Sequence, residues 1–262
     1  MATVLGTGTG GEGPPLAGKR ILQIGCGAIG GYLARMLAQM GAGLGAPFVL
    51  VDPDRLSRPN VRRHQLGLGE TGENKAGALG LEIARSFPGV EVVGIAEEIQ
   101  RRERMLGGVD LVIDVTGEVE VSEWLNAWTI ARRASNDPCP PVLYGWIAGH
   151  GAAAQSFLDM DDEYACYRCL QPDLSRRARF DPLTEPPSEP VTACGEQPTT
   201  PYGPAASTAA ASLVAAHVAD WSAGKPHHLL RTVRIDWSAT VKRDPKSPQK
   251  ATDCPACRRA AS

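Results

Sequence analysis

Two pairs of cysteines with the spacing C-x-x-C stand far apart in this chain of 262 residues. They are Cys166 with Cys169 and Cys254 with Cys257. Four cysteine thiolates fill the tetrahedral coordination of a structural zinc ion and leave no position for a substrate. The 84 residues between the pairs exceed a zinc-ribbon spacing, so the fold must bring them together. A thioredoxin-like redox pair is the alternative, but neither pair has the strand–helix context that it needs. The sequence therefore predicts one structural Zn²⁺.

A glycine-rich turn, "GCGAIG", forms a second candidate site. Gly25, Gly27 and Gly30 match the pattern G-x-G-x-x-G between an apolar run and a helical pattern. The first glycine permits a tight turn, the second lets the backbone approach a phosphate, and a helix N-terminus favours negative charge. Asp52 ends the next apolar run, where an acidic residue binds ribose in many nucleotide-binding folds. The pattern predicts a nucleotide site without choosing among NAD, FAD and ATP, and a turn needed only for packing is the alternative.

Polar and basic residues follow Asp52 at short intervals. They are Asp54, Asn60, Arg62, Arg63 and His64, with Lys75 further along the chain. Arginine binds phosphate in a bidentate manner and lysine acts as a point charge, so this group suits a triphosphate. A solvated basic loop is the alternative.

The ordered motifs "GCGAIG", "DPD", "PNVRRH" and "ENKAG" resemble the ThiF/MoeB/ubiquitin-E1 adenylation family, and the resemblance runs from about Lys19 to the C-terminus. Members of that family bind ATP and Mg²⁺, adenylate the C-terminal glycine of a ubiquitin-like protein and release pyrophosphate. The resemblance implies that Asp52, with Asp54, lies in the ATP site and binds ribose. It implies that Asn60, Arg63 and Lys75 contact phosphates, with Arg63 and Lys75 stabilising charge at the α-phosphate. His64 stands in place of the family's usual glutamine, and the two cysteine pairs also occur in the ThiF/MoeB branch.

The chain departs from the family in two places. The family usually has D-x-x-D-N after the fourth strand, and its second Asp helps to hold Mg²⁺. Here Asp114 is present, Gly117 takes the second position, and Glu118 is adjacent. The resemblance therefore implies magnesium binding by Asp114, either with Glu118 in place of the missing Asp or by Asp114 alone. The family's N-terminal arginine is also missing, since the first 18 residues contain no arginine. These departures keep a catalytically weakened homologue as an alternative.

Cys194 lies in an irregular segment, outside both cysteine pairs. In the resembling family a cysteine at this place, in the crossover loop, receives the activated carboxyl as a thioester or acyl persulfide. A thiolate is a suitable nucleophile toward an acyl-adenylate. Cys194 is therefore predicted to be catalytic, and a loop cysteine without chemistry is the alternative.

The elements that must position these residues alternate between strands and helices. A helix is predicted after the glycine turn and others over 72–86, 121–135 and 205–224; strands are predicted at 21–24, 46–52, 90–99, 109–117 and 141–149, with a final strand or hairpin in 228–244. Such alternation implies a mostly parallel sheet covered on both faces. We predict an α/β, Rossmann-like, doubly wound fold with a crossover loop over 171–204 and C-terminal strands joined by the Cys₄ zinc site. Residues 1–18 are predicted to be a flexible tail and residues 19–262 a single domain.

Composition limits the class of protein. The formal net charge is −2, which is untypical of a general nucleic-acid binder. No apolar run approaches the roughly 20 residues of a membrane span, and no secretion signal is evident. Seven cysteines, an odd number, argue against a disulfide framework. We expect a cytoplasmic protein without membrane or nucleic-acid partners.

The leading hypothesis is an E1-like enzyme that adenylates a ubiquitin-like protein and passes the acyl group through Cys194 to an E2-like or sulfur-accepting partner. Its relatives are usually homodimers, so a homodimer is expected. Adenylation of a small molecule, a peptide terminus or a tRNA base is a second hypothesis, and a non-catalytic scaffold is a third. NAD(P)-dependent oxidoreduction is disfavoured by Asn60, Arg63 and Lys75 and by the lack of an evident acid for hydride transfer.

Overall fold

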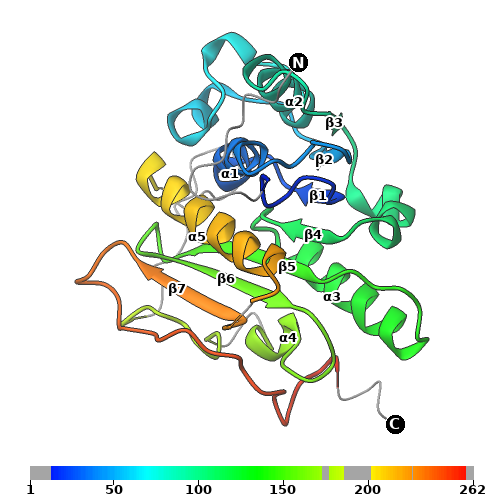
Figure 1. The fold of residues 1–262 in the computed structure, drawn as a ribbon. Helices are drawn as coiled ribbons and strands as arrows, with labels where there is room; N and C mark the ends of the chain where they lie inside the picture. The colour runs from blue at the N-terminus through cyan, green and yellow to red at the C-terminus, as the bar shows by residue number, and fades with distance from the viewer. Residues whose placement is uncertain (1–12, 173–176, 186–201, 226, 258–262) are drawn as a thin grey trace.

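The computed structural model describes residues 13–172, 177–185, 202–225 and 227–257. In this part of the chain seven strands form one sheet in the order β3-β2-β1-β4-β5-β6-β7 (Figure 1). The strands are β1 (Ile21–Ile24), β2 (Phe48–Val51), β3 (Val92–Ile95), β4 (Leu111–Asp114), β5 (Val142–Ala148), β6 (Ala153–Asp159) and β7 (Leu230–Arg234). The first five are parallel, whereas β6 runs antiparallel to both β5 and β7. The predicted mostly parallel sheet is confirmed.

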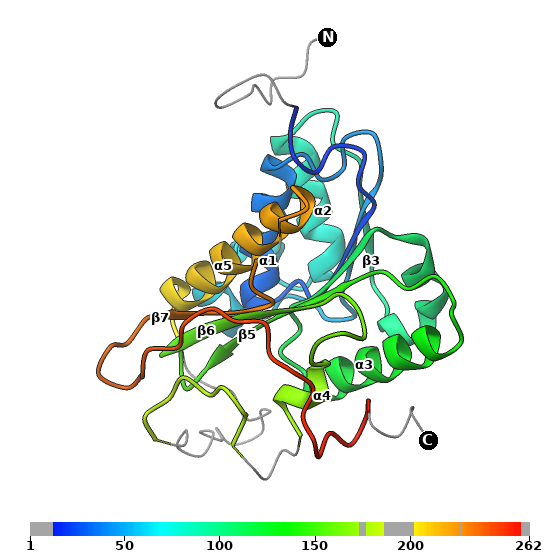
Figure 2. The ribbon, with the colours of Figure 1, turned by 60° about the horizontal axis from the view of Figure 1, so that its bottom comes forward.

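Helices cover both faces of the sheet, as a doubly wound fold requires (Figure 2). One face carries α1 (Ala28–Gln39), α2 (Lys75–Ser86) and α5 (Pro204–Ser222); the other carries α3 (Val119–Ala134) and the short α4 (Tyr167–Leu170). Three 3₁₀ segments, η1 (Arg58–Arg63), η2 (Leu68–Glu70) and η3 (Ile99–Gly108), lie in the connections. Among the described helices, none has both the length and the apolar character that crossing a bilayer demands.

The core lies between these two helical layers and the central strands. All four residues of β1, of β2 and of β4 are buried, as expected for parallel strands covered on both sides. Leu16 also belongs to this core, because its side chain is fully buried and its amide donates to the carbonyl of Met40. The packed part of the chain therefore begins before Lys19.

The hairpin of β5 and β6 was not anticipated, since no element was predicted for residues 150–165. Gly149, His150 and Gly151 all have positive φ and make the turn, which then sets Tyr144 opposite Phe157. The sequence of β6, "AAQSFLD", is poor in β-branched residues and begins with two alanines. Its strand conformation therefore comes from pairing on both sides and from complete burial, which local propensity does not reveal.

Candidate functional site

The carboxyl ends of β1, β2 and β4 meet at one edge of the sheet. Ile24, the last residue of β1, pairs with Val51 on one side and with Asp114 on the other. The chain leaves β1 toward β2, and β4 lies on the opposite side of β1, so the strand order reverses here. In open α/β sheets ligands bind in the crevice at such a point. Gly25, Asp52 and Asp114 all stand at this edge.

The three glycines of the turn after β1 serve different purposes. Gly25 has a φ of +91°, and a Cβ there would lie 2.8 Å from the backbone of Thr116. A Cβ at Gly30 would lie 2.0 Å from the carbonyl oxygen of Gly25. Both positions are therefore required by packing. Gly27, by contrast, has only open space where its Cβ would stand. Packing does not explain this glycine, whereas close approach of a ligand to the backbone at the start of α1 would.

Asp52 is buried next to the glycine turn and holds it in place through a hydrogen bond. One carboxylate oxygen accepts a hydrogen bond from the amide of Cys26 at 2.7 Å, and the other accepts from the amide of Asp54 at 2.8 Å. Burial raises the pKa of Asp52, and the nearby charge of Lys75 acts in the opposite direction. A carboxylate oxygen has more than one lone pair, so these bonds leave acceptor capacity for a ribose hydroxyl.

Lys75 lies at the first residue of α2 with its side chain buried. Its Nζ lies 2.7 Å from a carboxylate oxygen of Asp54. Asn74 precedes it and fixes the whole segment: its Oδ1 caps α2 by accepting from the amide of Gly77, and its Nδ2 donates to the carbonyls of Asp52 and Asp54. An ammonium group has three donors, so Lys75 can hold Asp54 and a phosphate oxygen together.

The 3₁₀ segment η1 carries the two other predicted phosphate-binding residues. Asn60 stabilises the start of η1, because its Oδ1 accepts from the amide of Ser57 at 3.2 Å. The guanidinium carbon of Arg63 lies 4.8 Å from the centre of the Tyr202 ring. Arg62 beside it is exposed, so the structure places this arginine at the surface.

His64, which stands where the resembling family has glutamine, ties η1 to the glycine turn. Its Nδ1 accepts a hydrogen bond from the amide of Leu66 at 3.0 Å. The proton of the neutral ring must then be on Nε2, which donates to the carbonyl of Cys26 at 2.6 Å. Burial is the main cause that lowers the pKa of His64.

This arrangement predicts a pH-dependent contribution of His64 to stability. The unfolded chain takes up a proton near pH 6.5, whereas the folded chain resists it, so the free energy of unfolding falls as the pH drops below about 6.5. The loss attributable to one such group is at most about 1.4 kcal/mol per pH unit. Urea unfolding between pH 8 and pH 5 should show a smaller loss for His64→Gln than for the wild-type chain.

The comparison isolates His64, because His217, whose pKa is lowered to about 3 by burial, is present in both proteins. His227→Gln, at an exposed position, serves as the control and should follow the wild-type curve. Identical curves for wild type and His64→Gln would contradict the assignment.

Asp114, the last residue of β4, is buried and held by three donors. One oxygen accepts from the amide and the hydroxyl of Thr116, and the other accepts from Ser122 Oγ at 2.5 Å. Burial raises its pKa. Gly117 has a φ of +73°, a conformation that favours glycine over the family's Asp. At Glu118 the pKa is raised, first by burial and then by the charges of the carboxylates across the site, chiefly Asp54.

The four predicted zinc ligands meet in space. All Sγ atoms of Cys166, Cys169, Cys254 and Cys257 lie within 4.8 Å of one another. Three of the separations are 3.6, 3.7 and 3.8 Å. A tetrahedron with Zn–S bonds of about 2.3 Å has edges of about 3.8 Å, so the donor set fits zinc. The amide of Ala251 also donates to Cys169 Sγ, as is usual around a metal-bound thiolate.

Several residues of the candidate site were not predicted from the sequence. Asn74 was recognisable as an N-cap residue at the start of a helix, but its bonds to the second strand end were not. Thr116 contacts Asp114 two residues before it, a local turn contact that was not predicted, whereas Ser122 and Tyr202 act through contacts that no local pattern encodes. Cys194, the predicted nucleophile, lies outside the described residues.

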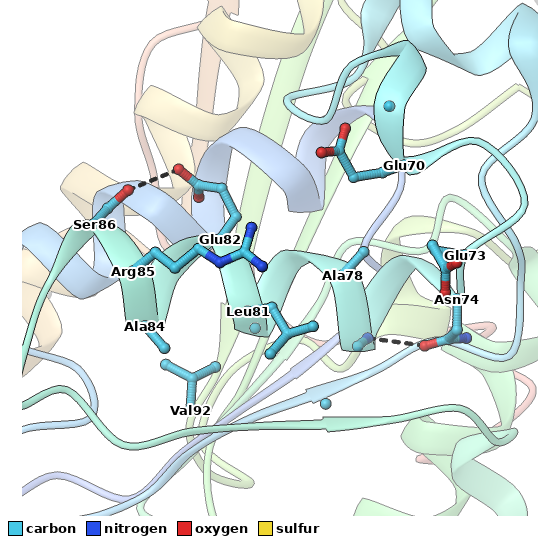
Figure 3. Close-up of a pocket in the computed structure, with 14 residues that line it drawn as sticks. Glu70, Glu73, Asn74, Ala78, Leu81, Glu82, Ala84, Arg85, Ser86 and Val92 are labelled. Atoms are coloured by element: carbon cyan, nitrogen blue, oxygen red, sulfur yellow. Dashed lines mark hydrogen bonds between the residues drawn. The ribbon is translucent and has the colours of Figure 1, made fainter.

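A separate groove of about 820 Å³ lies along the outer side of α2 (Figure 3). Its lining includes Glu70, Leu81, Arg85 and Val92, whereas Gly25, Asp52 and Asp114 at the strand ends do not line it. Asn74 also lines the groove, and its Oδ1 accepts from the amide of Gly77.

Comparison with known proteins agrees with this geometry. The sequence profile of the ThiF family matches residues 15–256. The ATP-dependent ubiquitin transferase-like protein Cap2 of Pseudomonas aeruginosa is 38% identical over 245 residues, which are 92% of this chain and 43% of that protein. Mouse adenylyltransferase and sulfurtransferase MOCS3 is 28% identical over 193 residues, 69% of this chain and 35% of that protein. The chain thus spans less than half the length of these curated relatives.

Among solved structures, the crystal structure of Escherichia coli MccB with ATP superimposes with a TM-score of 0.66 and 19% sequence identity. The match covers 93% of this chain and 68% of MccB. At this level of identity the likeness supports the fold.

Proposed function

The chain belongs to the ThiF family, and on that premise we propose that it is an ATP-dependent, E1-like adenylyltransferase that activates the C-terminal glycine of a ubiquitin-like protein. One observation supports the proposal most. The unobstructed backbone at Gly27 opens on the same sheet edge as the braced carboxylate of Asp52 and the buried ammonium of Lys75. A phosphate chain needs such an amide-lined approach, and ATP supplies both the phosphates and the ribose.

In the proposed reaction a substrate carboxylate oxygen attacks the α-phosphorus of ATP. The bond between the α-phosphorus and the bridging oxygen breaks, and pyrophosphate leaves with the electron pair. Lys75 and Arg63 stabilise the negative charge that develops on the phosphates, Asn60 binds a phosphate oxygen, and Asp52 fixes the ribose. Such transfers depend mainly on positioning and electrostatics, which the buried Lys75 and the half-buried Asn60 and Arg63 would provide.

The acidic residues at the strand ends suit a magnesium ion. Mg²⁺ typically takes one or two carboxylates and completes its shell with water and substrate phosphates. We assign this role to Asp114, which Thr116 and Ser122 orient, and to Glu118 beside it. When bound, Mg²⁺ neutralises phosphate charge. Burial is the main cause that raises the pKa of both carboxyl groups, and a bound cation would lower it.

Exchange of radiolabelled pyrophosphate into ATP tests the proposal, because it requires reversible formation of an acyl-adenylate. Ubiquitin-like proteins that end in glycine should support exchange, whereas the same proteins without that glycine should not. Peptides and small carboxylic acids form a second set of substrates. Exchange only with members of that second set would overturn the proposal that the substrate is a ubiquitin-like protein. No exchange with any substrate would favour the hypothesis of a non-catalytic scaffold.

The second proposed step uses Cys194. Its thiolate attacks the carbonyl carbon of the acyl-adenylate, a thioester forms, and AMP leaves. Cys194→Ala should therefore abolish a thiol-sensitive acyl-enzyme while pyrophosphate exchange continues. Mass spectrometry of the intact protein under non-reducing conditions measures the adduct. Cys139→Ala is the matched control, and an adduct that persists in Cys194→Ala would remove this residue from the mechanism.

The remaining expectations concern the acyl acceptor, the oligomeric state and the cellular location of the protein. We propose that the acyl group passes to an E2-like protein or a sulfur acceptor, and that the chain works as a homodimer. Four reduced thiolates and a need for ATP fit the cytoplasm.

A further inference from the structure

Tyr202 lies near the end of the predicted crossover loop, two residues before α5 begins, and its ring covers the guanidinium group of Arg63. The distance from the guanidinium carbon to the ring centre is 4.8 Å. Burial raises the pKa of the phenol, so the ring faces Arg63 in its neutral form at physiological pH. The pair therefore has the geometry of a cation–π interaction at the edge of the candidate nucleotide site.

The turn between β5 and β6 packs closely against Tyr202. A Cβ at Gly151, in the turn between β5 and β6, would lie only 2.8 Å from Tyr202 Cβ. Gly151 has a φ of +92°, so the turn both requires glycine and leaves the space that Tyr202 fills. Gly203 follows immediately as the N-cap of α5, and α5 contacts η1. Tyr202 is thus packed against the turn between β5 and β6, next to the start of a helix that contacts η1.

We propose that Tyr202 is a positioning residue, which holds the guanidinium plane of Arg63 in the orientation needed to meet the phosphates of ATP. The inference rests on the proposed function, in which Arg63 contacts those phosphates. An arginine side chain has many rotamers, and an aromatic face restricts it to a stacked arrangement. In a stacked arrangement the N–H donors lie at the edges of the guanidinium plane, the geometry in which arginine meets the oxygens of a phosphate.

Tyr202 follows Cys194, the predicted nucleophile, by eight positions in the sequence.

Binding of a non-hydrolysable ATP analogue, measured by calorimetry, tests the inference without any need for the acyl substrate. Tyr202→Leu and Tyr202→Met remove the aromatic face and should weaken binding about fivefold. Tyr202→Phe keeps the face and should bind as the wild type does. Trp237→Leu breaks a similar pair with Arg234, whose guanidinium carbon lies 4.4 Å from the Trp237 ring, outside the candidate site, and should have no effect. Thermal unfolding of each variant checks its fold.

A double-mutant cycle shows whether Tyr202 acts through Arg63. In an Arg63→Ala background, Tyr202→Leu should change affinity less than twofold, because the group that it positions is gone. Equal losses in both backgrounds, or a Phe variant as weak as Leu, would overturn the inference. A different result would contradict the proposed function: if Arg63→Ala binds the analogue normally, Arg63 is not a phosphate ligand. If Arg63→Ala binds weakly while Tyr202→Leu and Tyr202→Met bind normally, only the role of Tyr202 is overturned.

Discussion

Replacement of Lys75 by methionine is expected to lower ATP–pyrophosphate exchange by about 10²–10³-fold, equivalent to about 2.7–4 kcal/mol of lost transition-state stabilisation. Lys75 is buried at the start of α2, and Asn74 holds its backbone against both aspartates of the DPD motif. A charge fixed in this way does not reorganise when negative charge develops on the phosphates, which makes it most effective there.

The variant should still fold. Methionine has nearly the length of the lysine stem, and the side chain of Asp54 is 62% exposed, so water can solvate that carboxylate once Nζ is absent. Arg62→Met, which removes an exposed positive charge one residue from Arg63, is the matched control and should exchange within about twofold of the wild type. Lys75→Met with unimpaired exchange would exclude Lys75 from phosphate binding.

Loss of the metal site should have the largest effect on stability. Cys166 and Cys254 are 88 positions apart, and a cross-link that closes a loop of this length removes about 4–5 kcal/mol of entropy from the unfolded chain in the chain-entropy model. Cys254→Ser is therefore expected to lose bound zinc and to lower the free energy of unfolding by several kcal/mol, a large part of the stability of an ordinary domain.

Elemental analysis and urea unfolding measure both consequences. The wild-type chain should contain about one zinc per molecule. Cys139→Ser changes a half-buried cysteine outside the cluster and should retain the metal and most of the stability. A folded wild-type chain without zinc, or a Cys254→Ser variant with unchanged stability, would refute a structural zinc site.

The sequence predicted the parts of the site that depend on local spacing. Gly25, Asp52 and Asp114 follow or end buried strands, and parallel strands bring their carboxyl ends to one edge. What the sequence did not reveal are the contacts between distant segments. Ser122 reaches Asp114 from the next helix, and the bond of His64 to the carbonyl of Cys26 crosses 38 positions.

The same distinction applies to the fold. The central parallel strands β1, β2 and β4 were visible as apolar runs, because burial on both faces leaves no polar alternation. The strand β6 was missed, since an alanine-rich segment takes strand conformation only when β5 and β7 are in place beside it. The turn that makes this hairpin contains two glycines around His150, a local signal that could have been used.

A zinc ion bound by both cysteine pairs would hold the structure together even where the chain between the pairs is cut. The residues between Cys169 and Cys254 include the crossover segment, α5 and β7. A single peptide bond cut in the crossover segment would leave one fragment with β1 to β6 and another with α5 and β7. Strand pairing between β6 and β7, together with the predicted zinc ion shared by the two cysteine pairs, would hold these fragments together. We therefore expect two separately expressed pieces to reassemble when zinc is supplied.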